Sequence, residues 1–168
     1  MTALARSLAR ILAPLNSIAL WLSALGLVAM TAAVAWQVYG RYVLNDSPTW
    51  VEPISIQLMG WFILLGAAVG VREGYHLGFE VLRAIVPRTV ARLMSYVSDA
   101  LVGGFGLAMA WYGAELARGT WTARLPVLGW PGGVDFLPLV AGGILIALFS
   151  LERIVNTLAG ADAALARG

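Results

Sequence analysis

Four long apolar stretches most strongly constrain how this chain can fold. They cover residues 17–39, 54–71, 93–114 and 132–151. Only Asp99 and Asp135 bring charge into them. A helix needs about 20 mainly apolar residues to cross the hydrocarbon core of a bilayer, and each stretch is about that long. The sequence therefore predicts an all-α fold, an integral membrane bundle of four transmembrane helices in a single membrane domain over residues 1–168.

Composition supports this class and excludes several others. Hydrophobic residues make up 60% of the chain and charged residues 12%, against about 25% charged in soluble domains. The net charge of +2 is too small for a nucleic-acid-binding face. With no Cys and only His76, the chain has no thiolate metal site, iron–sulfur cluster, multi-His zinc site or bis-histidine haem. We therefore expect no cofactor, no metal and no nucleic-acid partner.

The distribution of arginine predicts the orientation in the membrane. All 11 basic residues are Arg. Eight lie in the two tails and in the segment between the second and third spans, and the other side holds Arg41, Arg118 and Arg124. Because basic residues concentrate on the cytoplasmic side, both termini are predicted to be cytoplasmic. The first stretch is longer than the 7–15-residue core of a signal peptide, so we expect it to remain as a span.

Aromatic side chains gather near the predicted outer boundary. Such a belt anchors a protein at the lipid interface, which is the simpler interpretation. The bias to one side also suits a docking surface for an extracytoplasmic partner. These residues are Trp36, Tyr39, Tyr42, Trp50, Trp111, Tyr112, Trp121 and Trp130.

The connecting segments contain few groups that point to chemistry. Glu52 precedes Pro53 at a predicted helix start, where the helix dipole favours a negative charge; pairing with Arg41 or a partner protein is the alternative. Residues 77–86 have apolar positions at helical spacing and predict a short amphipathic helix at the membrane surface. His76 is interpreted as a structural hydrogen-bonding residue. A four-span membrane enzyme would need clustered polar groups, so we expect no catalytic residue.

Asp99 is the most notable polar group within a span. An ionisable residue there is costly and is a functional hypothesis by default. It lies about 9 Å along its helix from Leu93, at about 1.5 Å per residue. We interpret it as pairing with an Arg or polar group at a helix interface. The spans otherwise lack the midplane polar clusters and broken helices of a transporter that works alone.

Small residues recur at helical spacing in the second span, at Gly66, Gly70 and Gly74. Similar pairs occur at Gly104 and Ala108 and at Gly143 and Ala147. Such stripes let helices approach closely. They predict helix packing within the chain or with another chain.

An ordered set of residues around the second span resembles the small membrane subunit, of DctQ type, of the tripartite ATP-independent periplasmic (TRAP) transporters. The chain departs from the family pattern at Pro53, where a second Glu is usual, and at Phe79-Glu80, where Val-Asp is usual. The second departure keeps the charge. The residues that carry the resemblance are Arg41, Tyr42, Asn45, Trp50, Glu52, Arg72, Gly74, His76, Gly78, Glu80 and Leu82.

The resemblance implies an accessory subunit of the bacterial inner membrane that binds and steadies a large multi-span subunit. That large subunit would carry the solute by a cation-coupled elevator movement. A periplasmic binding protein would deliver an organic acid and dock on the outer face. Besides lipid, these are the expected partners. Structural or partner-interface roles are expected for Arg41, Trp50, Glu52, Arg72, His76, Glu80 and Asp99.

Other functions remain open from the sequence alone. The small subunit of a tripartite tricarboxylate transporter has a similar size and role. A self-associating four-span protein, either a channel or a membrane enzyme, is the other alternative.

Overall fold

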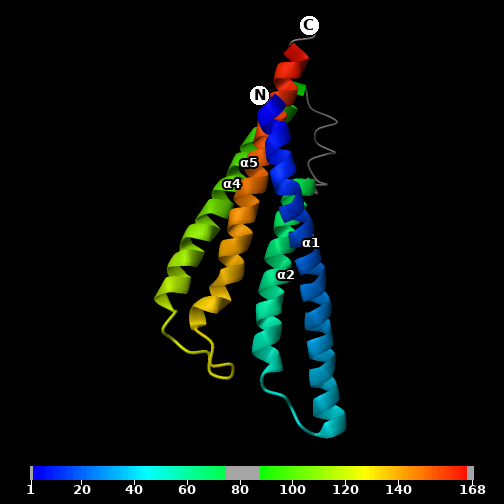
Figure 1. Cartoon of the computed structure of the whole chain (residues 1–168), viewed down its shortest axis with the longest axis vertical. Coiled ribbons are helices and arrows are strands. Elements are labelled where there is room, and N and C mark those ends of the chain that lie inside the picture. Colours follow the sequence, from blue (N-terminus) through cyan, green and yellow to red (C-terminus); the bar gives the residue numbers. More distant parts are fainter. Residues whose placement is uncertain (1, 75–87, 166–168) are drawn as a thin grey trace.

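A computed structural model describes residues 2–74 and 88–165 (Figure 1). Within them, four helices are long and apolar enough to cross a membrane, which confirms the predicted all-helical membrane class. The elements in chain order are α1 (Thr2–Tyr39), the π-helix η1 (Gly40–Leu44), α2 (Val51–Glu73), α4 (Arg88–Gly119), the 3-10 helix η2 (Gly132–Phe136) and α5 (Leu137–Leu165).

The helices extend beyond the predicted spans. At about 1.5 Å per residue, the 38 residues of α1 run about 57 Å, well beyond a hydrocarbon core of about 30 Å. Hydropathy marks only the part of a helix that can lie in lipid, whereas backbone hydrogen bonding continues into the flanking polar turns. The predicted surface helix at residues 77–86 lies outside the described residues, as do His76 and Glu80.

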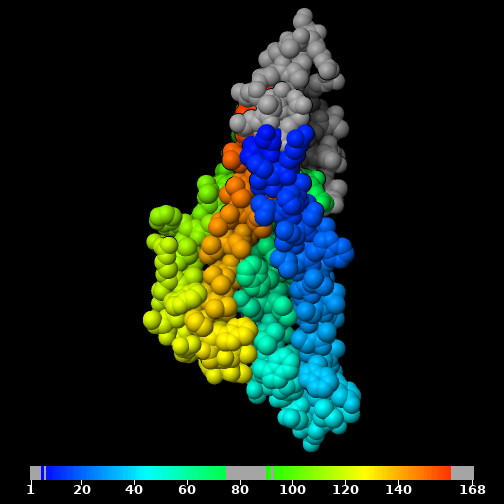
Figure 2. Space-filling view, in the orientation of Figure 1, coloured from blue at the N-terminus to red at the C-terminus, as the bar shows by residue number. Residues whose placement is uncertain are grey.

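The long helices pack in the order α4, α5, α2, α1 (Figure 1). Both ends of the described chain lie at one end of the molecule, here called the terminal end, where the helices converge. Toward the opposite loop end the two hairpins diverge in this view, and the α1–α2 hairpin reaches further than the α4–α5 hairpin. Gln57 of α2 still donates to the Val134 carbonyl of η2 at 3.0 Å. Figure 2 shows all four helices on one face of the molecule. The arrangement is therefore closer to a row than to a square bundle.

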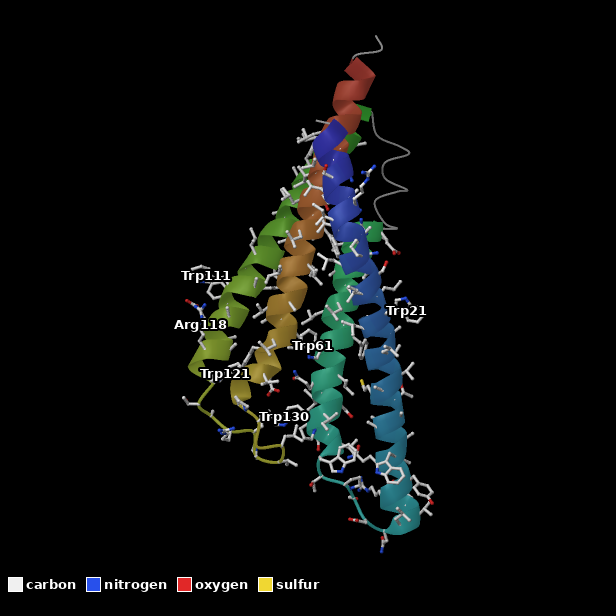
Figure 3. All side chains as sticks on the ribbon, in the orientation of Figure 1. Trp21, Trp61, Trp111, Arg118, Trp121 and Trp130 are labelled. Carbon is white, nitrogen blue, oxygen red and sulfur yellow. The ribbon has the colours of Figure 1, made fainter. Side chains whose placement is uncertain are left out.

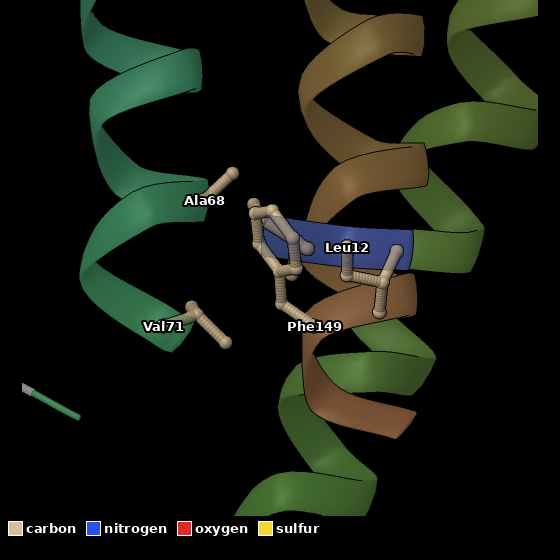
Figure 4. Packing of buried hydrophobic residues seen from close by; sticks show 5 residues of the cluster. Leu12, Ala68, Val71 and Phe149 are labelled. Atoms are coloured by element: carbon tan, nitrogen blue, oxygen red, sulfur yellow. The ribbon is translucent and has the colours of Figure 1, made fainter. Parts of the chain in front are cut away.

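The main apolar core lies near the terminal end and joins three helices (Figure 4). Phe149 of α5 is fully buried and packs with Leu12 of α1 and with Ala68 and Val71 of α2. Away from this cluster, little of the apolar surface is covered. Only 11–33% of each spanning window is buried within the chain. The spans therefore leave wide apolar faces for lipid or for another membrane protein.

The small residues contribute to packing in different ways. A methyl group on Gly66 would lie 3.0 Å from Ser23 Oγ of α1, whereas one on Gly70 would meet no atom of the described residues within 4 Å. Gly74 ends α2 in the left-handed conformation, with φ 74°. The three glycines therefore do not form one packing face within the chain. α4 and α5 also approach each other closely, since a methyl group on Gly106 would lie 2.8 Å from the Gly143 carbonyl.

Candidate functional site

Four ionisable side chains form a charged cluster near the terminal end: Arg72, Asp99, Glu152 and Arg153. Arg72 leaves the last turn of α2 and meets Glu152 of α5 in a two-point contact. Its Nε donates to Oε2 at 2.8 Å and its Nη2 to Oε1 at 3.0 Å. The guanidinium also lies 5.5 Å from the centre of the Phe149 ring and donates to the Ala9 carbonyl of α1 at 3.3 Å. Arg72 therefore ties α2 to both α5 and α1.

Arg153 makes the second ion pair of the charged cluster. Its Nε donates to Asp99 Oδ1 of α4 at 2.9 Å, and its Nη1 donates to the Val71 carbonyl of α2 at 3.1 Å. The last carbonyls of a helix have no partner within the helix and favour a nearby cation. Asp99 is only 3% exposed. Arg153 therefore satisfies a buried carboxylate and a helix end together.

The helical repeat explains how α5 contributes a residue to both ion pairs. Glu152 and Arg153 are consecutive on α5, so their side chains leave the helix about 100° apart. One faces α2 and the other faces α4. A polar cavity of about 400 Å³ opens beside the charged cluster, lined by Asn16, Arg72, Glu73, Glu152, Arg153 and Asn156.

Two members of the charged cluster, Glu152 and Arg153, are absent from the sequence-based set of site residues. Both follow the predicted end of the fourth span at residue 151, where they look like tail residues. α5 continues without a break to Leu165, and that continuation brings them inside the fold. The available signal is Asp99 itself, which indicates an Arg or polar partner on a neighbouring helix.

The α1–α2 loop places Arg41, Trp50 and Glu52 at the loop end, far along the molecule from the charged cluster (Figure 1). All three are exposed. The Cζ atom of Arg41 lies 5.9 Å from the centre of the Tyr42 ring. Among the described side chains, Arg41 forms no ion pair with Glu52. Glu52 stands in the first turn of α2, where the helix dipole favours its charge.

Gly40 shapes the start of this loop. A methyl group there would lie 2.8 Å from the Asp46 carbonyl. The Gly40 carbonyl accepts from the Asp46 N–H at 3.0 Å, and Asn45 adopts a left-handed conformation with φ 55°. The turn therefore presents exposed side chains at the far tip of the α1–α2 hairpin. Tyr42 is 78% exposed and Trp50 is 43% exposed.

The α4–α5 hairpin also presents aromatic side chains at its loop end. Figure 3 shows Trp121 and Trp130 there, with Trp111 further along α4. All three are exposed. Arg124 donates to the Gly129 carbonyl at 3.0 Å and closes the loop between them. Both hairpins therefore place aromatic residues toward the same end of the molecule.

Comparison with known proteins identifies the family. Residues 30–160 match the family described as tripartite ATP-independent periplasmic transporters, DctQ component. The chain belongs to this family. The match runs from within α1 to within α5, so it includes the charged cluster and the α1–α2 loop. The family consists of transporter subunits, not enzymes, and the chain is a multi-pass membrane protein.

Individual relatives agree with this assignment. The chain is 31% identical over 94 residues to the C4-dicarboxylate TRAP transporter small permease protein DctQ of Vibrio cholerae, covering 56% of this chain and 40% of that protein. It is 26% identical over 134 residues to the sialic acid TRAP transporter small permease protein SiaQ of the same organism, covering 79% and 76%. A TRAP transporter small permease protein of Haemophilus influenzae is 26% identical over 139 residues, covering 79% and 82%.

Proposed function

We propose that this chain is the small subunit that holds the large membrane subunit of a TRAP-type transporter in place while that subunit moves the solute. One observation carries the proposal: between 67% and 89% of each spanning window is left unburied by the chain itself. That apolar surface is available to a membrane partner, whereas a transporter that worked alone would have midplane polar clusters or broken helices in its spans. In the described part of the chain, the buried charges are instead paired with one another at the terminal end.

The distribution of arginine along the sequence supports an orientation for this chain. The terminal end carries the charged cluster, and the sequence places most arginines on that side. We place this end in the cytoplasm and the two hairpin loops on the outer side of the bacterial inner membrane. The aromatic and exposed residues of the α1–α2 loop then face the compartment in which a solute-binding protein would dock.

The site residues divide between these two ends. Arg72 and Asp99 hold the cytoplasmic ends of the helices together through Glu152 and Arg153. Arg41, Trp50 and Glu52 form the part of the outer surface that contacts the binding protein or the large subunit. His76 and Glu80, which lie between α2 and α4 in the sequence, belong to the cytoplasmic side.

The transported solute is proposed to be an organic acid, taken up with a cation through an elevator movement of the large subunit. Two relatives are named for C4-dicarboxylates and for sialic acid, and both solutes carry carboxylate groups. The small subunit itself has no solute site in this proposal. Specificity belongs to the binding protein and the large subunit.

Reconstituted transport tests the proposal. Thermal-shift screening of the binding protein against organic acids first identifies the solute. Uptake of that labelled solute is then measured in proteoliposomes that contain the large subunit with or without this chain, under an inward sodium or proton gradient. We expect uptake only when this chain is present. Equal uptake without it would contradict the scaffolding role.

A further inference from the structure

A long apolar groove runs between α4 and α5. It consists of two cavities in line, of about 380 Å³ and 340 Å³, which share Leu107 of α4. On α4 the lining residues recur three or four apart from Asp99 to Arg118, so they occupy one face of the helix. These 19 residue steps correspond to about 28 Å. That length matches the hydrocarbon core of a bilayer, about 30 Å.

The floor of the groove near the charged cluster is built from small residues. Ala100, Gly103 and Gly104 of α4 lie opposite Ala147 of α5. Gly103 packs against Ser150, where an added methyl group would lie 3.1 Å from Cβ, whereas Gly104 has nothing within 4 Å. Small residues let a second helix approach closely in a membrane. Among the described residues, Gly104 does not allow a close approach of another helix of this chain.

Ser150 gives an independent indication of what fills the groove. It is 1% exposed and lines the cavity nearer the charged cluster. Its Oγ has no hydrogen-bond partner among the described residues. A buried hydroxyl without a partner is unfavourable, and most buried polar groups have one. An acyl chain cannot accept or donate a hydrogen bond, whereas a helix with a polar side chain can.

The opposite edge of the row differs in character. α1 presents large apolar side chains to the outside, including Trp21 at 69%, Leu25 at 59% and Val28 at 65% exposure. Figure 3 shows Trp21 on the outer side of α1. These large side chains suit lipid. α1 also carries Asn16 Oδ1, unpartnered among the described residues, at the polar cavity beside the charged cluster, and the small residues Gly26 and Ala29, which line a smaller cavity of about 270 Å³ against α2.

We propose that the groove between α4 and α5 receives one transmembrane helix of the large membrane subunit. That helix packs against Gly103 and Gly104 and supplies a hydrogen-bonding group to Ser150 Oγ. At the other end of the groove, Glu115 and Arg118 are exposed and provide charges of both signs for the flanking residues of the incoming helix. The inference rests on the proposed function, because it specifies where the large subunit binds.

A matched pair of substitutions tests the location. Gly104→Leu places a large side chain in the groove at a position of α4 where an added Cβ meets no described atom within 4 Å, and Gly70→Leu places the same side chain at an equally open glycine of α2. The tagged chain is purified from cells that co-express the large subunit. We expect Gly104→Leu to lower the recovered large subunit at least tenfold, with unchanged expression and thermal stability of the isolated chain. Gly70→Leu should recover the wild-type amount.

The remaining outcomes are distinguishable. Wild-type recovery in both variants, equal loss in both, or loss in Gly70→Leu alone would overturn the groove as the binding site. If the wild-type chain fails to recover the large subunit, the proposed function is contradicted, not only the position of the contact.

The Ser150→Ala variant tests whether the Ser150 hydroxyl forms a hydrogen bond with the large subunit. Removing a hydroxyl that has no internal partner should raise the melting temperature of the isolated chain. The same change should weaken retention of the large subunit about threefold, in line with a typical interhelical hydrogen bond. Unchanged retention would overturn the hydrogen bond to Ser150.

Photocrosslinking identifies the occupant. The chain has no Cys, so Leu151→Cys, at a groove residue that is 50% exposed, carries a benzophenone label at a single position without filling the floor of the groove. In the assembled complex we expect crosslinks to one helix of the large subunit. Crosslinks to lipid alone, or to a second copy of this chain, would overturn the proposal.

Discussion

Arg72 and Arg153 each bind the helix that carries the other. Arg72 of α2 holds Glu152 of α5 at 2.8 Å, and Arg153 of α5 holds the Val71 carbonyl of α2 at 3.1 Å. Each guanidinium also reaches a third helix, α1 or α4. These contacts fasten the terminal ends of all four helices.

Asp99→Ala should lower the stability of the chain. It leaves the Arg153 guanidinium, 26% exposed, without its ion pair. Breaking a buried pair typically costs about 3–5 kcal/mol, and access of Arg153 to solvent reduces this to about 1–3 kcal/mol. Unfolding in detergent measures the change. Asp99→Asn should retain assembly and transport, whereas loss of cation coupling alone in that variant would contradict a structural role.

Arg72→Met should destabilise the chain more than Asp99→Ala. The Glu152 side chain is 6% exposed, and losing its partner leaves a buried charge, at a cost of about 3 kcal/mol or more. Solute uptake should fall while membrane insertion persists. Arg124→Ala is the control, because Arg124 is exposed and binds only within its own loop. A double variant, Arg72→Met with Glu152→Leu, should regain most of the stability.

Gly74→Ala and Gly70→Ala should have opposite effects on melting temperature. Gly74 has φ 74°, a conformation that costs other residues about 1–2 kcal/mol. A methyl group there would also lie 2.6 Å from Arg153 Nη1. Gly70 is helical with open space around it, so Ala should stabilise it by up to about 1 kcal/mol. A lower melting temperature for Gly70→Ala would contradict the open space around this residue.

Glu52→Ala should reduce solute uptake while the complex with the large subunit stays intact. Glu52 is exposed in the first turn of α2, so its loss should change stability by less than about 1 kcal/mol. The expected defect therefore lies in contacts on the outer face. Asp46→Ala, at another exposed acid of the same loop, is the control. Wild-type uptake by Glu52→Ala would remove Glu52 from the functional surface.

Hydropathy alone predicted the four spans, because the requirement for about 20 apolar residues is independent of tertiary contacts. It could not predict where the helices end, since α1 and α5 continue into polar turns. For that reason, Glu152 and Arg153 do not stand out in the sequence, although Asp99 indicates an Arg or polar partner at a helix interface. Spacing alone also could not distinguish Gly66, which faces α1, from Gly70, which faces open space. Those differences depend on helix rotation.

The most direct test of the central claim is the composition of the native complex. The tagged chain is gently solubilised from its own membrane, and mass spectrometry and native mass measurement identify what accompanies it. We predict one large multi-span protein per copy of this chain. Recovery of the chain alone, as a stable homo-oligomer, would contradict the account.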